Sequence, residues 1–562
     1  MTSFTEKFNQ KTELLWEKLS SSSERFKELA EKLGHIAAFI SVSDIHQQAY
    51  VFRAVGETAE TAWKKAKANA LEFISAENLD PAWVKADVIS GAEKRSLAEL
   101  LAELPKVHKN FFRKGISFDD KLDRAIIEAE LNTCSLLDYN TGSIDLKELN
   151  DHLTDNDLPV LDRLPDEVIV FTCESAFCDE KGVAYTLYSD DIRCGRRVLG
   201  RLEKENVYRV ITSAADYLSM QIGLDGKFDY GFFPTGSKEI SGYSILRHVS
   251  SVRSLLCSYR LTHDRFLKEQ IDSAIGYAVK SMMYKYPERA GTENVLYLAE
   301  KTENEVTLGG NAAAVIVLTE YMDIFGTDKY TKLARELGNG ILELFDERDG
   351  SFFHVLKYPS FAPRDKFRDV YYDGKAVFAL SRLFGLTKDK RYIDAAKQAV
   401  DRFIEKNYER YADPWVAYSV NELTKYYPLP KYLNFGVKNV EANLDKIYDQ
   451  PTTCHTYLEL LCASFELAER IRNENLNCPA MESFDMTGLA DAIFYCAELM
   501  LNGYGYPEHV MYFEQPSCAL GAFFMRHEDF RIRIDDVQNF AGAYYPFYRN
   551  FEKLNEIRNR AR

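Results

Sequence analysis

A helical hairpin that repeats about every 60 residues is the feature that most limits how this chain can fold. The repeat is visible in the stretches LTHDRFLKEQIDSAIGYAVK, FGTDKYTKLARELGNGILEL and LTKDKRYIDAAKQAVDRFIE. Each stretch has a turn with Thr and Asp, then an aromatic residue, then an amphipathic helix. The aromatic residues Phe266, Tyr330 and Tyr392 are 64 and 62 residues apart, and related units occur at Tyr208 and Tyr432. A fixed period of this length is typical of a repeat architecture.

The two helices of each hairpin differ in where their apolar residues lie. The first is apolar nearly all round, as in NAAAVIVLTEYMDIF, KAVFALSRLFGL, WVAYSVNEL and TYLELLCASFEL, whereas the second carries Lys, Arg and Glu on one side. A helix that is apolar all round must be buried, and an amphipathic helix can face solvent. The pattern predicts a mainly α fold, with an (α/α)6 toroid over residues 196–562. A TPR-like solenoid is the alternative, but its repeats would be about 34 residues long.

The residues before 196 have a different pattern. Residues 1–34 are predicted to form one long polar helix with a sparse apolar stripe. The stripe is expected to pack on the helix's own domain, and the alternative is a short coiled-coil or docking contact with a protein partner. Residues 35–195 alternate strand-like runs such as IAAFISV and AYVFRAV with helical runs such as ETAWKKAKANALEFI, which predicts a smaller α+β domain. This region has no phosphate loop or dinucleotide-binding fingerprint, so its role is open.

Composition and charge limit the possible partners. The chain has 70 basic and 86 acidic residues, and its formal net charge of −16 argues against a nucleic-acid or anionic membrane surface. An aromatic content of 13% suits deep cores and also clefts that stack sugar rings. We expect no transmembrane segment, because no signal-peptide pattern and no sufficiently long apolar run is present. Ten scattered cysteines predict a reduced, cytoplasmic protein.

The hairpin repeat, notably RLFGLTKDKRYIDAAKQAVDRFI, resembles the (α/α)6-toroid carbohydrate-active enzymes over roughly residues 200–550. These are helical glycoside hydrolases, polysaccharide lyases and sugar epimerases. The resemblance is one of fold, and fold alone does not give function. It implies a carbohydrate in the toroid cleft and action as a glycoside hydrolase or a uronate lyase or epimerase, with no cofactor. The alternative is a non-catalytic glycan-binding or scaffold protein of polysaccharide biosynthesis.

The start of each inner helix is the expected position of a site, because long chain excursions precede these helices and loops on a rigid scaffold often carry function. The catalytic candidates at or near these positions are Tyr243, His248, Tyr372, Asp373 and His455. The substrate-binding candidates are Arg247, Asn311, Trp415, Tyr418, Asp229 and Arg533. Arg533 lies in the last such segment, FRIRIDDVQNFAGAYY, which would meet the first if the ring closes.

Two reaction types remain open. Hydrolysis of a glycosidic bond needs two carboxylates about 5–10 Å apart, and the candidates are Asp229, Asp373, Asp413 and Glu459. Proton abstraction beside a uronate carboxylate needs a His or Tyr base and an Arg, which the stretch ISGYSILRHVSSVRSLL contains. Tyr243 and Arg247 are four residues apart and share a helix face, but His248 lies about 140° from Tyr243.

Simpler structural roles also fit several of these residues. Asp413 before Pro414 has the pattern of a helix N-cap, and Gly309-Gly310 could allow a sharp turn. Cys454-His455 resembles the adjacent zinc ligands of lanthionine-cyclase toroids, but that site needs a further cysteine from a preceding loop. The nearest upstream cysteine, Cys257, falls within a helix pattern, so no metal is expected.

Overall fold

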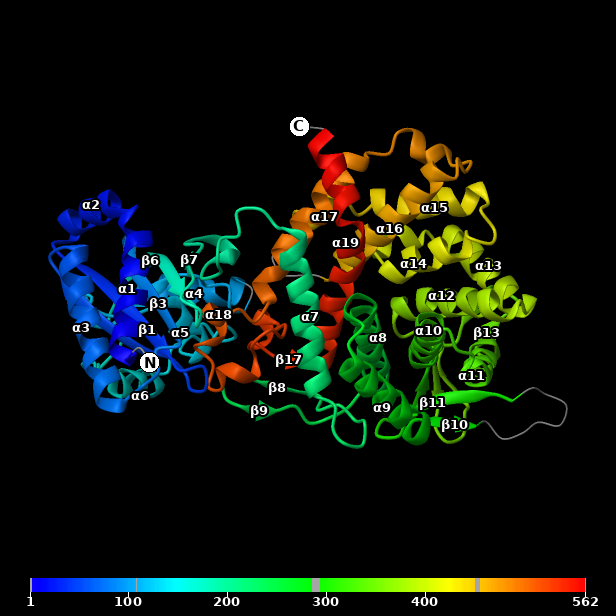
Figure 1. Ribbon diagram of the computed structural model, residues 1–562, viewed down its shortest axis with the longest axis horizontal. Helices are drawn as coiled ribbons and strands as arrows, with labels where there is room; N and C mark the ends of the chain where they lie inside the picture. The colour runs from blue at the N-terminus through cyan, green and yellow to red at the C-terminus, as the bar shows by residue number, and fades with distance from the viewer. Residues whose placement is uncertain (1–2, 108, 286–293, 450–454, 561–562) are drawn as a thin grey trace. The chain divides into compact units, whose positions relative to one another are not determined.

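The computed structural model describes residues 3–107, 109–285, 294–449 and 455–560. Its contacts divide the chain into two compact units. Unit 1 contains residues 1–201, 231–240 and 502–532, and unit 2 contains residues 202–230, 241–501 and 533–562. Most of the secondary structure is helical (Figure 1), which confirms the mainly α class.

The predicted toroid range, residues 196–562, does not coincide with unit 2. Residues 231–240 and 502–532 lie within the expected toroid range but belong to unit 1. The second segment is built of short helical turns rather than hairpins, and it bonds to the N-terminal residues. The carboxylate of Glu508 accepts two bonds from the Arg197 guanidinium, at 2.8 and 2.6 Å, and the Tyr512 hydroxyl lies 2.8 Å from the Ser41 hydroxyl.

Unit 1 is built on a seven-stranded antiparallel sheet of order β2-β1-β3-β6-β4-β5, with β7 paired to β6. The strands are β1 (Ile36–Ser43), β2 (Tyr50–Gly56), β3 (Trp83–Ser96), β4 (Gly115–Ser117), β5 (Ala125–Ile126), β6 (Glu167–Cys178) and β7 (Ala184–Thr186). The eight residues of β1 are all buried. A second core cluster is built around β4 and β6 by the helices α4 (Leu97–Glu103), α5 (Glu128–Thr133) and α6 (Leu146–Asp155). The unit also holds β8 (Gly231–Phe233), β9 (Lys238–Glu239) and α18 (Pro507–Val510).

The expected single helix over residues 1–34 is instead two helices, α1 (Phe4–Ser20) and α2 (Ser23–Leu33). The break falls in a serine run, where the hydroxyls of Ser20 and Ser21 bond back to carbonyls of the preceding turn and compete with helix continuation. The apolar stripe is buried: Phe8, Leu15 and Phe26 are at most 2% exposed. With α3 (Ala59–Glu77), these helices pack on the sheet, so the stripe is used within the unit.

Unit 2 is a closed ring of helical hairpins in its described residues (Figure 1). Each inner helix packs on the next, and the last packs on the first. The inner helices are α8 (Ile245–Thr262), α10 (Leu308–Phe325), α12 (Val370–Thr387), α14 (Pro414–Leu423), α16 (His455–Asn473) and α19 (Ile534–Arg560). The outer helices are α7 (Lys204–Met220), α9 (Arg265–Ser281), α11 (Thr331–Glu343), α13 (Lys390–Glu405), α15 (Pro430–Glu441) and α17 (Met486–Met500). The helices with all-round apolar sequences are inner helices, as predicted.

Helix α10 is long and apolar enough to cross a membrane by length and composition alone, and 78% of it is buried in the structure. Its burial follows from its place in the ring, where it contacts α8, α11 and α12. This position explains its composition, because a helix enclosed on all sides by other helices has no polar face.

Short strands form the excursions between the hairpins. One sheet has the order β10-β11-β12-β15-β16 and leads into α10 and α12. Its strands are β10 (Met283–Lys285), β11 (Leu296–Glu300), β12 (Glu305–Thr307), β15 (Val355–Lys357) and β16 (Pro363–Asp365). A separate pair consists of β13 (Phe345–Asp346) and β14 (Ser351–Phe352), and β17 (Ile532–Arg533) directly precedes α19.

Candidate functional site

The inner helices of unit 2 run parallel, so their first turns meet at one end of the ring. At the start of α8, Arg247 pairs with Asp535 at the start of α19. Further along α8, Arg253 pairs with Glu320 in the second half of α10. The side chains of the first turns therefore line one half of the ring interior, and those of later turns line the other.

Two glycines let the helix starts approach closely. A Cβ on Gly309 would lie 2.5 Å from the ring of Tyr372, and one on Gly374 would lie 2.7 Å from the backbone of Trp415. The Gly309-Gly310 pair does not form the sharp turn considered from the sequence. Both residues lie in the first turn of α10, where the Thr307 hydroxyl caps the helix by accepting from the Gly310 amide.

Asp535 is the most extensively bonded carboxylate among the helix starts. It is 3% exposed, and one oxygen accepts a 2.6 Å bond from the guanidinium of Arg247. The same oxygen accepts from the amides of Gln538 and Asn539, and the other accepts from Arg533 at 3.2 Å. These donors hold the carboxylate in one orientation. The Arg247 side chain remains 36% exposed and so is the member of this group open to a ligand.

Lys375 is a buried amine in the second turn of α12. The residue is 8% exposed, and its Nζ lies 4.6 Å from the centre of the Trp415 ring. Within the part of the chain that the structure describes, no carboxylate lies within ion-pair distance of it. Burial lowers the pKa of Lys375 to about 8, and the positive charge of Arg247 acts in the same direction. A fraction of the amine is therefore unprotonated near neutral pH.

Trp415 forms a half-buried aromatic surface between two cations. Its amide is bonded to the Asp413 carboxylate at 2.8 Å, which confirms Asp413 as the N-cap of α14. Lys375 lies against the indole ring, and the guanidinium carbon of Arg253 is 5.2 Å from the ring centre. The other oxygen of Asp413 is buried with no partner in the described residues, and burial holds the pKa of this carboxyl well above its usual value.

A second carboxylate, Glu459, comes from the second turn of α16. It is 5% exposed, and Nδ1 of His455 is 3.7 Å from its Oε2. The negative charges of Glu459 and Asp535 both act on the pKa of Lys375, so the three groups share one neighbourhood. We call these five residues the inner-wall cluster: Arg247, Lys375, Trp415, Glu459 and Asp535.

His248 points away from this cluster. It is fully buried, its Nε2 donates to the carbonyl of Ala274 at 2.9 Å, and its Nδ1 accepts from the hydroxyl of Tyr243 at 2.7 Å. Burial lowers the pKa of His248 to about 4. Both ring nitrogens are thus engaged in packing α8 on α9, and the Tyr243 hydroxyl is engaged with them. Of the two neighbouring residues, Arg247 faces the cluster.

Asp373 and Tyr372 are also fixed by neighbours. Asp373 accepts from Nε2 of His354 at 3.0 Å and from the hydroxyl of Tyr408 at 2.8 Å, while Nδ1 of His354 accepts from the Arg368 amide. The network is buried and ties α12 to the strands that precede it. Tyr372 is 8% exposed and covers Gly309.

The remaining predicted residues are dispersed. Asn311 is fully buried and bonds through its side chain to the backbone of Leu296 and Leu298, which holds β11 against α10. Asp229 is exposed in the excursion after α7. His455 and Trp415 lie at the inner-wall cluster, and Arg533 contacts it through Asp535. Cys454 lies outside the described residues.

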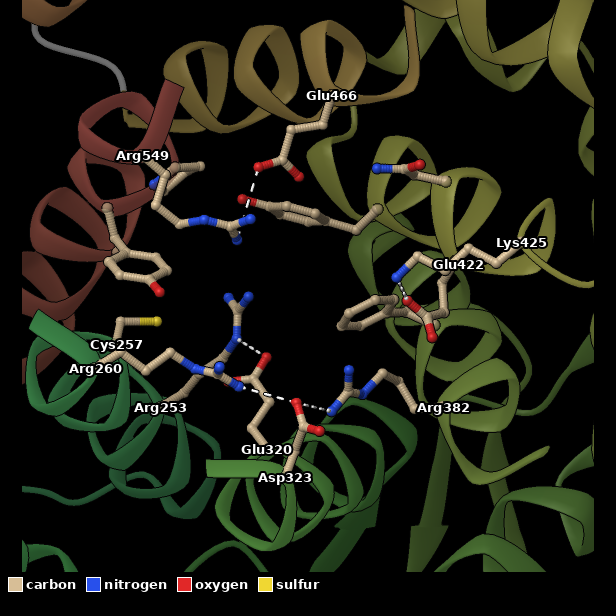
Figure 2. Close-up of a pocket in the computed structure, with 16 residues that line it drawn as sticks. Arg253, Cys257, Arg260, Glu320, Asp323, Arg382, Glu422, Lys425, Glu466 and Arg549 are labelled. Atoms are coloured by element: carbon tan, nitrogen blue, oxygen red, sulfur yellow. Dashed lines mark hydrogen bonds and ion pairs between the residues drawn. The ribbon is translucent and has the colours of Figure 1, made fainter. Parts of the chain in front are cut away.

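A hollow lies in the other half of the ring (Figure 2). It has a volume of about 230 Å³ and is lined by side chains from all six inner helices. Ion pairs surround it, including Arg253 with Glu320 at 3.2 Å and Arg260 with Asp323 at 3.0 Å. Tyr418, predicted as a ligand at the rim, lines this hollow instead. Arg253 contacts both regions, because its guanidinium also lies against Trp415.

Sequence reasoning missed Lys375, Arg253 and Glu320. A signal was present for Lys375 and Glu320, since each is a charged residue inside an inner helix that is rich in apolar residues, whereas Arg253 lies in a helix with several other polar residues. A charge on such a helix must be paired, bonded or turned toward a cavity. In the described ranges no group of three or more His, Cys, Asp or Glu side chains is arranged to hold a metal ion.

No family model matches the sequence, and a search of curated proteins finds no match. Solved structures match at the level of fold. A D-mannose isomerase shares 12% identity and a TM-score of 0.45 over 62% of this chain and 98% of that chain. A GH76 α-mannanase from Bacteroides thetaiotaomicron has 11% identity, a TM-score of 0.45 and coverages of 62% and 97%. A cellobiose 2-epimerase from Bacillus thermoamylovorans has 10% identity and a TM-score of 0.45, over 62% of this chain and 100% of that chain. These are (α/α)6-toroid carbohydrate-active enzymes, and the resemblance is one of fold.

Proposed function

We propose that unit 2 is the catalytic unit of a cytoplasmic carbohydrate-active enzyme that transfers a proton on a sugar or sugar acid bound at the inner-wall cluster. The observation that carries this proposal is Lys375, a buried amine with a pKa of about 8 that lies on Trp415. General bases work best when their pKa is close to the working pH. A lysine held in this state without an ion pair costs stability, so a role in proton transfer accounts for it.

The cluster supplies the groups that such a reaction needs. The indole face of Trp415 can stack on the apolar face of a sugar ring, and the half-exposed Arg247 can bind a carboxylate or hydroxyls. Unprotonated Lys375 takes the proton from the carbon next to the carbonyl or carboxylate. The electron pair of the broken C–H bond moves into that group, and Arg247 stabilises the resulting negative charge.

Two outcomes can follow from the same intermediate. Delivery of a solvent proton to the opposite face of the carbon gives the epimer, and the Lys375 ammonium releases its proton to solvent. Alternatively, the electron pair forms a carbon–carbon double bond and expels the oxygen on the next carbon, which takes the proton from the lysine ammonium, and this gives elimination. Both outcomes balance without a cofactor.

Glycoside hydrolysis is the second candidate, and the observation that favours it is the presence of two buried carboxylates, Asp535 and Glu459, at one cluster. In that reaction Asp535, bonded to Arg247 and Arg533, would act as the ionised carboxylate. Glu459 would act as the acid.

An incubation in D2O with a panel of aldoses, disaccharides and uronate oligosaccharides, followed by NMR, distinguishes these functions. The proposal expects deuterium at the carbon next to the carbonyl or carboxylate, or a new conjugated double bond. New reducing ends without deuterium would instead assign hydrolysis. Saturation-transfer signals without conversion would assign a non-catalytic glycan-binding protein.

Lys375→Met is expected to abolish deuterium incorporation while leaving sugar binding detectable. The matched control is Lys332→Met, because Lys332 lies on the outer helix α11 with a side chain 79% exposed. Equal turnover in the two variants would contradict the role of Lys375, and no binding of any sugar would contradict the carbohydrate assignment.

A further inference from the structure

A small cavity inside unit 1 is lined by many charged side chains. Its volume is about 20 Å³, and its lining includes Lys85, Arg113, Glu128, Gly195, His509 and Arg526. These residues come from β3, the segment before β4, α5, the loop after β7 and the returning segment 502–532. The cavity is separate from the toroid and takes no part in the function proposed above.

Arg526 brings a positive charge into this cavity without a close partner. The residue is 8% exposed, and the nearest carboxylate oxygen, on Glu128, is 3.8 Å from its Nη1. Its guanidinium lies against the rings of Phe530 and Phe524, at 5.0 and 5.6 Å. Within the described ranges its side chain donates no hydrogen bond. A buried charge in this state is strongly unfavourable unless something compensates it.

The other charges around the cavity are already matched. Lys85 pairs with Asp87 at 2.7 Å, and Arg113 pairs with Glu128 at 2.6 Å. Glu508, which also lines the cavity, pairs with Arg197 at 2.6 Å. Four cations therefore face three carboxylates, and the positive charge of Arg526 is left over. The positive field is also visible at His509, whose pKa is held well below its usual value by burial and by the charges of Arg526 and Arg113.

His509 adds unused hydrogen-bonding capacity. Both of its ring nitrogens are sealed from solvent and have no hydrogen-bond partner in the described residues. Buried polar atoms in folded proteins are nearly always bonded, so an unpartnered ring at a cavity indicates a missing occupant. Neutral histidine can direct one N–H group at that occupant.

Gly195 leaves the space in which an occupant would sit. Its φ is +81°, and a Cβ at this position would lie 3.7 Å from Nε2 of His509 and 3.8 Å from Nη2 of Arg113. The missing side chain keeps a gap between two hydrogen-bond donors, next to the uncompensated guanidinium.

We propose that this cavity binds one small monovalent anion of chloride size, held by Arg526, Arg113 and His509. The volume fits a single water-sized particle and is too small for sulfate or phosphate. A water molecule could bond to His509, but it would leave the charge of Arg526 uncompensated, so the charge balance favours an anion.

Crystals of the full chain grown in sodium bromide test the site directly. The expected result is an anomalous bromide peak between Arg526, Arg113 and His509. Absence of a peak there, or a peak that chloride does not displace, would overturn the proposal.

A thermal-unfolding series measures the contribution of Arg526. At constant ionic strength, replacement of gluconate by chloride is expected to raise Tm by about 2–4 °C once chloride exceeds its dissociation constant several-fold. Arg526→Met should lose this chloride response, and the control Arg25→Met, at a side chain 62% exposed in the same unit, should keep it. An unchanged response in Arg526→Met would reject Arg526 as the anion's ligand. If that variant does not fold, the bromide peak decides.

Discussion

The Nζ of Lys375 lies 4.6 Å from the centre of the Trp415 ring, in the interior of a ring of helices. Contact with an aromatic face favours the protonated amine, whereas burial and the nearby Arg247 disfavour it. Burial is the larger effect, and it brings the pKa of Lys375 to about 8. The same contact places the amine next to the surface on which a sugar ring would stack.

The pH dependence of turnover should follow the titration of Lys375. If its free amine is the base, kcat/KM rises tenfold per pH unit below about pH 8 and levels off above it, in line with the lowered pKa. The measurement is kcat/KM from pH 6 to 9.5 on the best substrate from the sugar panel. A profile flat through pH 8 would exclude Lys375 as the base.

Replacement of Lys375 should stabilise the protein while removing activity. Because the folded-state pKa is lowered, the unfolded state binds more protons between about pH 8 and the usual lysine pKa of 10.5, and stability increases with pH across that window. Below pH 8 the full penalty is present, so Lys375→Met is expected to gain about 1–3 kcal/mol at pH 7. Urea unfolding at pH 7 and pH 10 measures this, and the gain should be smaller at pH 10.

His248 is expected to matter for stability and not for chemistry. His248→Ala leaves the Tyr243 hydroxyl and the Ala274 carbonyl without partners, at a cost of about 2–4 kcal/mol. Turnover per folded molecule should stay within about twofold of the parent protein, a change of well under 1 kcal/mol in the barrier. Loss of turnover in a fully folded His248→Ala sample would return this residue to the catalytic group.

The lowered pKa of His248 also predicts acid sensitivity. Its folded-state pKa of about 4 lies below the usual 6.5, so the neutral ring's contribution is fully present above pH 6.5 and declines as pH falls toward 4. His248→Asn should flatten the stability profile in that window. Unfolding free energies at pH 7, 5.5 and 4.5 give the comparison.

A substitution at Gly374 tests whether α12 and α14 pack closely at this residue. A Cβ there would lie 2.7 Å from the Trp415 backbone, so Gly374→Ala should force the helices apart, cost about 1–3 kcal/mol and reduce turnover. The control is Gly276→Ala in the outer helix α9, where no atom lies within 4 Å of the added carbon. That change should be neutral or stabilising by up to about 1 kcal/mol. Equal effects of the two substitutions would contradict the close packing of α12 on α14.

The arrangement of inner and outer helices in unit 2 could be predicted because buried and half-exposed helices differ in how their apolar residues are distributed. Helix α10 is apolar all round and α13 is amphipathic, and these patterns separate inner from outer helices. The pattern does not reveal which way single polar residues turn. Arg247 and His248 are neighbours in sequence, and only the positions of Asp535 and Ala274 show that one faces the ring interior and the other faces α9.

Other features depend on contacts between distant parts of the chain. The segment 502–532 joins unit 1 through residues such as Glu508 and Tyr512, and its short turns carry no periodicity that would indicate this. Lys375 could have been noticed as a charge in an apolar helix. Its lack of a partner could not have been predicted, because that depends on the side chains of five other helices.

The closure of α19 on α8 has a consequence for synthesis of the protein. The pair between Arg247 and Asp535 joins residues 288 apart, and the pair between Arg197 and Glu508 in unit 1 joins residues 311 apart. Unit 1 includes residues 502–532 and unit 2 includes residues 533–562, so neither unit can be complete until these segments have been synthesised. Apolar inner helices such as α10 are therefore synthesised well before α19, and they are exposed to aggregation until the ring can close.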